Sequence, residues 1–198
     1  MKAVCVYCGS AKGVDPIFQQ ATQDLARHLV DAGIDLVYGG GCVGLMGVLA
    51  DAVMRLGGQA TGVIPQALMD REVGHPGLTK LHIVKDMHAR KAMMAELSDG
   101  FIALPGGMGT LEELFEVLTW AQIGLHDKPV GLLNVAGFYD GLLDFLNHQT
   151  TQGFIRPEHR ELLAHDSQAA GLLARLRAHH GKHAGKLLDK QTARDLLL

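Results

Sequence analysis

The residues best suited to chemistry gather in the segment from Phe101 to Glu113, which reads FIALPGGMGTLEE. An apolar strand runs here through three glycines into a helix with two glutamates near its start. Backbone N–H groups point outward at a helix start and the helix dipole favours negative charge, so such glycine loops usually bind anions. Glu112 and Glu113 therefore stand beside a site suited to phosphate, and their presence there needs an explanation.

Glu113 also has a purely structural interpretation. Thr110 and Glu113 have the spacing of a capping box, in which the glutamate reaches back to the N–H of the cap residue. Glu112 would interact favourably with the helix dipole. The local pattern alone favours capping over catalysis.

A second glycine loop occurs in the stretch LVYGGGCVGLMG, where Gly39, Gly41 and Gly44 satisfy G-x-G-x-x-G between a predicted strand and a predicted helix. A dinucleotide site would need an acidic residue at the end of the next strand, which instead ends Ile64-Pro65-Gln66. A Walker A loop would need Lys followed by Ser or Thr. Two glycine loops at one sheet edge favour a ligand with a phosphate and a sugar; alternatively, the glycines only permit tight turns.

The elements that position these loops alternate between strands and helices. Apolar β-branched runs predict strands at 2–8, 34–41, 59–65, 81–85, 101–107 and 129–134, with a short one near Ala164. Helical periodicity and capping residues predict helices at 15–33, 44–57, 87–97, 111–123, 139–151 and 167–179, and an irregular loop at 66–80.

This alternation predicts an α/β fold, a Rossmann-like doubly wound parallel sheet in three α/β/α layers. We expect one domain at 1–180 and a C-terminal tail at 181–198 that could form a short helix. Right-handed crossovers bring the carboxyl ends of the strands to one edge, where ligands bind in such folds.

Composition narrows the class of protein. The 198 residues are 47% hydrophobic and 20% charged with a net charge of −3, which suits a soluble domain and argues against nucleic-acid or membrane partners. The N-terminus enters a strand directly and three cysteines form no disulfide framework, so a cytoplasmic location is expected. Cys5 and Cys8 are interpreted as buried structural residues. The histidines show no metal-ligand spacing, and we predict neither a metal nor a cofactor.

Beyond these patterns, PGGMGTLEE resembles the PGGxGTxxE motif of the LOG family, the cytokinin riboside 5′-monophosphate phosphoribohydrolases, also described as lysine decarboxylase-like. Matching stretches are CGS at 8–10, YGGGCVGLMG at 38–47, GVIP at 62–65, DMHARKAMMAE at 86–96 and TWAQIGLHDKPVGLLN at 119–134. They keep the family's order over roughly residues 1–157. Pyridoxal phosphate chemistry needs a Schiff-base lysine with a partner for the pyridinium nitrogen, and the sequence offers no support for a decarboxylase.

The resemblance implies a hydrolase that cleaves the N-glycosidic bond of a nucleoside 5′-monophosphate, either a cytokinin nucleotide or AMP. It implies Arg90 and Glu113 as the catalytic pair and a homodimer with the site near the interface. The substrate contacts that it implies are Glu72, Arg90, Lys91, Gly107, Met108, Gly109, Thr110, Leu111, Glu112, Glu113 and Thr119. The phosphate- or ribose-binding candidates of the glycine loops are Ser10, Gly39, Gly40, Gly41, Gly44 and Gly106.

This chemistry would explain the glutamates. Cleavage of the N-glycosidic bond builds positive charge on the sugar, and a carboxylate beside C1′ can stabilise that charge and orient or deprotonate water. The helix start would tend to keep Glu113 ionised. Arg90 is a poor proton donor. Lys91 lies about 100° around the helix from Arg90 and, without the resemblance, would be read as an exposed lysine.

Two other classes of function were weighed. A non-catalytic nucleotide- or molybdenum-cofactor-binding carrier would share the fold and the glycine loops, although the Arg and Glu pair argues against it. An NAD-dependent enzyme is suggested only by the G-x-G-x-x-G pattern.

Overall fold

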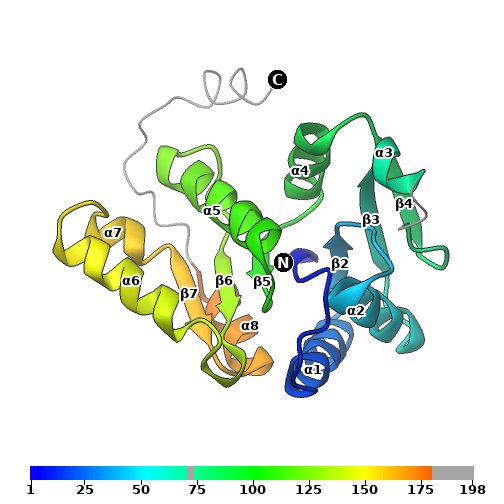
Figure 1. Cartoon of the computed structure of the whole chain (residues 1–198), viewed down its shortest axis with the longest axis horizontal. Helices are drawn as coiled ribbons and strands as arrows, with labels where there is room; N and C mark the ends of the chain where they lie inside the picture. Colours follow the sequence, from blue (N-terminus) through cyan, green and yellow to red (C-terminus); the bar gives the residue numbers. More distant parts are fainter. Residues whose placement is uncertain (71–73, 180–198) are drawn as a thin grey trace.

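Seven parallel strands form the central sheet of the described residues, 1–70 and 74–179, in a computed structural model of the chain (Figure 1). In chain order they are β1 (Ala3–Tyr7), β2 (Asp35–Tyr38), β3 (Ala60–Pro65), β4 (Lys80–Val84), β5 (Phe101–Ala103), β6 (Val130–Leu133) and β7 (Leu163–Asp166). Across the sheet the order is β4-β3-β2-β1-β5-β6-β7, with every neighbouring pair parallel. The predicted doubly wound α/β fold is confirmed.

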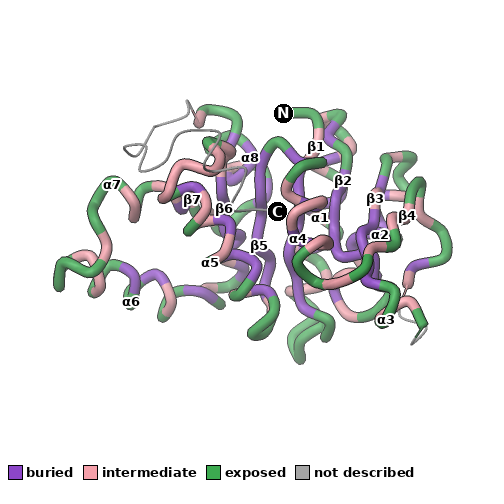
Figure 2. Tube along the Cα trace, turned by 90° about the horizontal axis from the view of Figure 1, so that it is seen from above, coloured by how far each residue is buried: buried purple, intermediate pink, exposed green. Residues whose placement is uncertain are grey.

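Helices cover both faces of this sheet. One apolar cluster joins it to α1 (Ile17–Asp31), α2 (Gly44–Arg55) and α8 (Ala169–Arg177). The other joins it to α4 (Met87–Glu96), α5 (Met108–Ile123) and α6 (Asp140–Thr151). The buried segments run along the central strands, and four consecutive residues of β1 are buried (Figure 2). Strands covered on both faces require continuous apolar runs, which is why β1 shows no alternation of polar and apolar residues.

The order of the strands sets the position of the site. The chain begins with β1 in the middle, moves outward through β2, β3 and β4, and returns with β5 to the opposite side of β1. The helices after β1 and β5 therefore pack on opposite faces, and a crevice opens at the carboxyl ends of these two strands. The loop of PGGMGTLEE starts at this switch point.

The first long helix shows how the sequence fixes the element ends. The helix predicted at 15–33 runs from Ile17 to Asp31 with Pro16 as its N-cap, and the Ile17 N–H donates to Asp15 Oδ1 at 2.9 Å. After the helix, Gly33 adopts a φ of 63° and the Ile34 N–H bonds the Leu29 carbonyl. Glycine suits this left-handed turn, which ends the helical path of the chain.

Several boundaries differ from the prediction. The loop predicted as irregular contains a short helix, α3 (Gln66–Met69), and two further short elements, η1 (Val135–Gly137) and α7 (Pro157–Arg160), were not predicted. The predicted helix at 111–123 begins at Met108. The tail at 181–198 lies outside the described residues, so the domain boundary stays a prediction.

The cysteines follow the structural interpretation. Cys5 and Cys8 are buried free thiols, and burial raises the pKa of both. Thiols held protonated are poor nucleophiles, so a redox role for this spacing has no support. None of the described helices is both long and apolar enough to cross a membrane.

Candidate active site

A cavity of about 260 Å³ opens at the switch point, beyond the carboxyl ends of β1 and β5. It brings together predicted site residues from four separate segments. Those that line it are Ser10, Gly39, Arg90, Gly107, Met108, Gly109, Thr110, Glu112 and Glu113. These predicted residues therefore lie together around one cavity at the end of the PGGMGTLEE strand.

The start of α5 offers free backbone donors to this cavity. Gly107 is the N-cap, and the first intrahelical bond runs from the Leu111 N–H to the Gly107 carbonyl at 3.2 Å. Within the described part of the chain, the amides of Met108, Gly109 and Thr110 have no acceptor. Three unsatisfied N–H groups at the positive end of a 16-residue helix are the kind of donors that can bind an anion.

Gly106 permits this turn by close packing. A Cβ on Gly106 would lie 2.1 Å from Thr110 Oγ1, so no larger residue fits without displacing Thr110. Thr110 itself is buried inside the first helical turn. It is not the N-cap, and the predicted capping box is therefore wrong.

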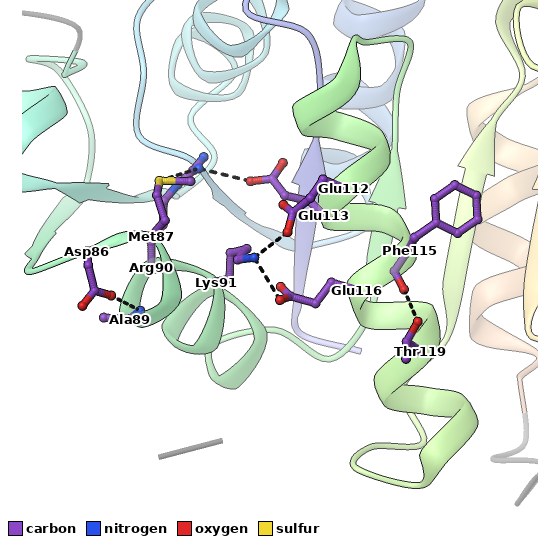
Figure 3. A network of polar contacts seen from close by, with 10 residues as sticks. All are labelled: Asp86, Met87, Ala89, Arg90, Lys91, Glu112, Glu113, Phe115, Glu116 and Thr119. Atoms are coloured by element: carbon purple, nitrogen blue, oxygen red, sulfur yellow. Dashed lines mark hydrogen bonds and ion pairs between the residues drawn. The ribbon is translucent and has the colours of Figure 1, made fainter. Parts of the chain in front are cut away.

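Glu113 instead forms an ion pair with Arg90 of α4 (Figure 3). Arg90 Nη1 lies 3.2 Å from Glu113 Oε1, and the two side chains are only 11% and 10% exposed. Arg90 Nε also donates to the Val63 carbonyl at 3.2 Å. Asp86 caps α4 by accepting a hydrogen bond from the Ala89 N–H at 2.8 Å, which fixes the helix that carries Arg90.

Burial controls the charge state of Glu113. Removal of the carboxyl group from water raises its pKa above the ordinary value, and the Arg90 guanidinium opposes this shift. The sequence led us to expect that the helix start keeps Glu113 ionised, and burial acts on the pKa in the opposite direction. The carboxyl lies five residues beyond the first helical residue, where the helix dipole is weak and burial dominates.

Lys91 is buried rather than exposed. Its side chain is 9% exposed, and Nζ donates to Glu112 Oε1 at 2.6 Å and to Glu116 Oε1 at 2.9 Å (Figure 3). It does not line the cavity. The reading of Lys91 as a solvated helix lysine is therefore wrong.

Thr119 and Leu111, two further predicted substrate contacts, lie away from the cavity. Thr119 is exposed and donates to the Phe115 carbonyl of its own helix at 2.7 Å, and Leu111 is half-buried and packs against the apolar cluster of α5. Neither lines the cavity within one chain. Glu72 lies outside the described residues.

The first glycine loop contributes less to the cavity than predicted, because only Gly39 lines it. Gly44 has a φ of 62°, and a Cβ there would lie 2.2 Å from the Ser10 carbonyl carbon. The Leu45 N–H, at the start of α2, donates to the Gly9 carbonyl at 3.0 Å rather than facing the cavity. Gly40 and Gly41 bond the segment around Gly74 and His75. Gly40 and Gly44 have positive φ values, which fits the alternative that these glycines permit tight turns, and Gly44 also leaves room for the Ser10 backbone.

Sequence reasoning missed several residues around the site. Met46 and Met87 line the cavity, and Glu116 bonds Lys91. The only available signal was for Glu116, which lies one helical turn after Glu112 and so shares its face. Among the described residues, no group of three or more His, Cys, Asp or Glu side chains could hold a metal.

Fold and site together define a Rossmann-like α/β protein whose cavity joins an anion-binding helix start to a buried arginine–glutamate pair. A family model described as "Possible lysine decarboxylase" matches residues 46–176. Cytokinin riboside 5′-monophosphate phosphoribohydrolase LOG3 of Arabidopsis thaliana is 49% identical over 189 residues, 94% of this chain and 88% of that protein. The corresponding LOG protein of Oryza sativa subsp. japonica is 51% identical over 175 residues, 88% and 72% of the two chains. This chain belongs to the LOG family.

Several solved structures have a fold similar to that of this chain. The molybdenum cofactor binding protein from Rippkaea orientalis matches with a TM-score of 0.68 at 20% identity, covering 90% of this chain and 97% of that one. A molybdenum cofactor carrier protein from Chlamydomonas reinhardtii matches with a TM-score of 0.65 at 18% identity, covering 89% and 96%. At such identities the likeness shows the shared fold alone, so it gives the carrier alternative no further support.

Proposed function

We propose that this chain is a phosphoribohydrolase, which hydrolyses the N-glycosidic bond of a nucleoside 5′-monophosphate to the free base and ribose 5-phosphate. The observation that carries the proposal is one cavity with free helix-start amides at one side and the buried Arg90–Glu113 pair at the other. The names of relatives about half identical to this chain support it.

In this mechanism the two ends of the ribose phosphate are bound separately. The 5′-phosphate accepts hydrogen bonds from the amides of Met108, Gly109 and Thr110, which fixes the sugar relative to α5. C1′ then lies beside Glu113, whose carboxylate stabilises the positive charge of the oxocarbenium-like transition state and orients the attacking water. Arg90 keeps this buried carboxylate ionised and offers N–H groups to ribose oxygens.

We propose a cytokinin riboside 5′-monophosphate or AMP as the substrate; with AMP the activity is that of an AMP nucleosidase. The test is chromatographic measurement of base released from AMP and from isopentenyladenosine 5′-monophosphate. Glu113→Gln removes the charge and keeps the shape, so release should fall by about 10²-fold or more. Glu158→Gln, on the exposed face of α7, is the matched control and should retain full activity. If wild type releases no base from either nucleotide, the proposed function is wrong.

We also propose that the protein is a homodimer through α4 and α5. Met87, Leu97 and Phe115 on or next to these helices are 41%, 39% and 36% exposed, an apolar surface of the kind that marks an interface. The cavity of about 260 Å³ is small for a ligand site, for which about 300–1,000 Å³ is usual, so a partner surface would complete it. Light scattering should give twice the 21.2 kDa of one chain, and a monomer mass would contradict the proposal.

A reducing, cytoplasmic location is proposed as well. The buried free thiols of Cys5 and Cys8 support it, because free thiols persist where glutathione keeps cysteines reduced. Fractionation of cells that produce the tagged protein tests this location. Recovery of the protein from the periplasm or the medium would contradict it.

A further inference from the structure

Five charged side chains form one cluster between α4 and α5, here called the α4–α5 charge cluster (Figure 3). It consists of Arg90 and Lys91 on α4 and of Glu112, Glu113 and Glu116 on α5. The ion pairs divide it in two. Arg90 pairs with Glu113, and both line the cavity, whereas Lys91 pairs with Glu112, which lines the cavity, and with Glu116, which does not.

The geometry leaves Lys91 little freedom to bind a ligand. Its ammonium group has three N–H donors, and two of them already bond carboxylates at 2.6 and 2.9 Å. The side chain is 9% exposed and is absent from the cavity lining. A buried ammonium must keep its partners, because the loss of either leaves a charge poorly compensated away from water.

The bonds of Lys91 join two successive turns of α5, because their acceptors lie about one turn apart. Glu112 and Glu116 are four residues apart, so they lie one above the other on the same face of the helix. Glu113 follows Glu112 directly and points about 100° away, toward Arg90. A cation that bonds both Glu112 and Glu116 therefore fixes the rotation of α5 about its own axis, and with it the direction of Glu113.

Building on the phosphoribohydrolase function proposed above, we propose that Lys91 is a positioning residue: its bonds to Glu112 and Glu116 hold α5 against α4 so that Glu113 faces Arg90. Lys91 does not contact the nucleotide. This role differs from the substrate contact that the family resemblance implies for Lys91.

The cluster also sets the charge balance around Glu113. Arg90 and Lys91 lower the pKa of Glu113, whereas Glu112 and Glu116 raise it together with burial. Cys5 and Tyr7 of β1, and Cys8 directly after it, also interact electrostatically with Glu113, and burial raises their own pKa values so that they stay neutral. Removal of Lys91 would thus expose Glu113 to two uncompensated carboxylates.

The experiment compares wild type, Lys91→Met, Glu116→Gln and the double variant in base release from AMP between pH 4 and 9. Activity requires ionised Glu113, so it falls as the pH drops through the pKa of Glu113. Lys91→Met removes a group that lowers this pKa, and the acid limb of kcat/KM should move to higher pH. Glu116→Gln removes a group that raises the pKa, and the limb should move to lower pH. A merely structural role would not produce opposite shifts.

The kinetic constants separate positioning from binding. Lys91→Met should lower kcat by about 10-fold or more, because misplacement of a catalytic group by a fraction of an ångström slows chemistry, and KM should change less than about threefold. Lys91→Arg, which keeps the charge, should restore the acid limb to the wild-type pH. A large rise in KM with an unchanged kcat and acid limb would show that Lys91 binds substrate and would overturn the proposal.

Urea unfolding of the same four proteins tests the positioning role of Lys91 without an activity measurement. The effects of Lys91→Met and Glu116→Gln on stability should be coupled. Each single variant raises the unfolding equilibrium constant by a factor, and the double variant should raise it by at least about fivefold less than the product of these two factors. Additive effects would overturn the proposal. If wild type releases no base but the two effects are coupled, the proposed function is wrong, whereas the positioning of α5 by Lys91 is supported.

Discussion

Replacement of Gly39 by alanine should displace Arg90 without disturbing the backbone. An alanine Cβ at Gly39 would lie 2.0 Å from Arg90 Nη2 and 3.1 Å from Cζ. Non-bonded contacts of this kind below 3.0 Å essentially never occur, so the guanidinium must move by about 1 Å. Gly39 has no positive φ, and alanine therefore meets no backbone strain there.

A shift of this size breaks the geometry around Glu113. Arg90 bonds the Val63 carbonyl and approaches Glu113 Oε1, both at 3.2 Å, and an additional 1 Å takes either contact beyond hydrogen-bond range. A misplacement of about 1 Å in a catalytic group can cost about 10²-fold in rate, so kcat/KM should fall by this factor. The arginine end is flexible and can find a new position, and the free energy of unfolding should change by no more than about 1–2 kcal/mol.

The assay is base release from AMP, with urea unfolding of the same protein samples. Gly141→Ala in α6 is the matched control, because a Cβ there meets no atom within 4 Å. This control should keep full activity and gain a few tenths to about 1 kcal/mol of stability. Wild-type activity of Gly39→Ala would refute the reasoning, since it would mean that the observed position of Arg90 is not required for the reaction.

Two further predictions concern the anion site and the core. Met108→Pro removes one free N–H at the first position of α5, where proline fits a helix. The KM for AMP should rise about 10-fold, while the stability measured in urea should not change. An unchanged KM would show that this amide does not bind the phosphate. His126 is half-buried against Phe101, and its partial removal from water lowers its pKa to about 4 from 6.5. Between pH 6.5 and 4 the imidazole of His126 is protonated in the unfolded chain but not in the folded one, so the free energy of unfolding should fall by about 3 kcal/mol as the pH drops through this range. In urea titrations, His126→Gln should make the free energy of unfolding depend less on pH. A slope equal to that of wild type would exclude His126 as its source.

The sequence predicted the fold well because the strands are continuous apolar runs and the helices carry clear ends. The start of α5 was predicted too late, at Leu111, because apolar periodicity begins there while Gly109 disfavours helix. Three helical residues before Leu111 face the cavity rather than the core, so periodicity gives no signal for them. They are nonetheless the residues whose amides are free.

Lys91 and the first glycine loop show what a local pattern leaves undetermined. Arg90 and Lys91 lie on neighbouring positions of α4, and both side chains are about 10% exposed because each forms ion pairs with glutamates of α5. A glycine in a loop can provide an amide to a ligand or make room for a neighbour. Only the positions of Arg90 and of the Ser10 backbone show that Gly39 and Gly44 make room.

The placement of an acid beside an anion site has a consequence for pH dependence. The bound phosphate adds negative charge at the start of α5, and a like charge disfavours ionisation of Glu113, whose pKa is already raised by burial. Arg90 opposes this effect but is present in the free and the bound enzyme alike. The pKa of Glu113 should therefore be higher in the substrate complex than in the free enzyme. Since kcat reports the complex and kcat/KM the free enzyme, the acid limb of kcat should lie at the higher pH. If the acid limbs of kcat and kcat/KM lie at the same pH, the phosphate and Glu113 do not share one site. The explanation given for the glutamates in PGGMGTLEE would then be wrong.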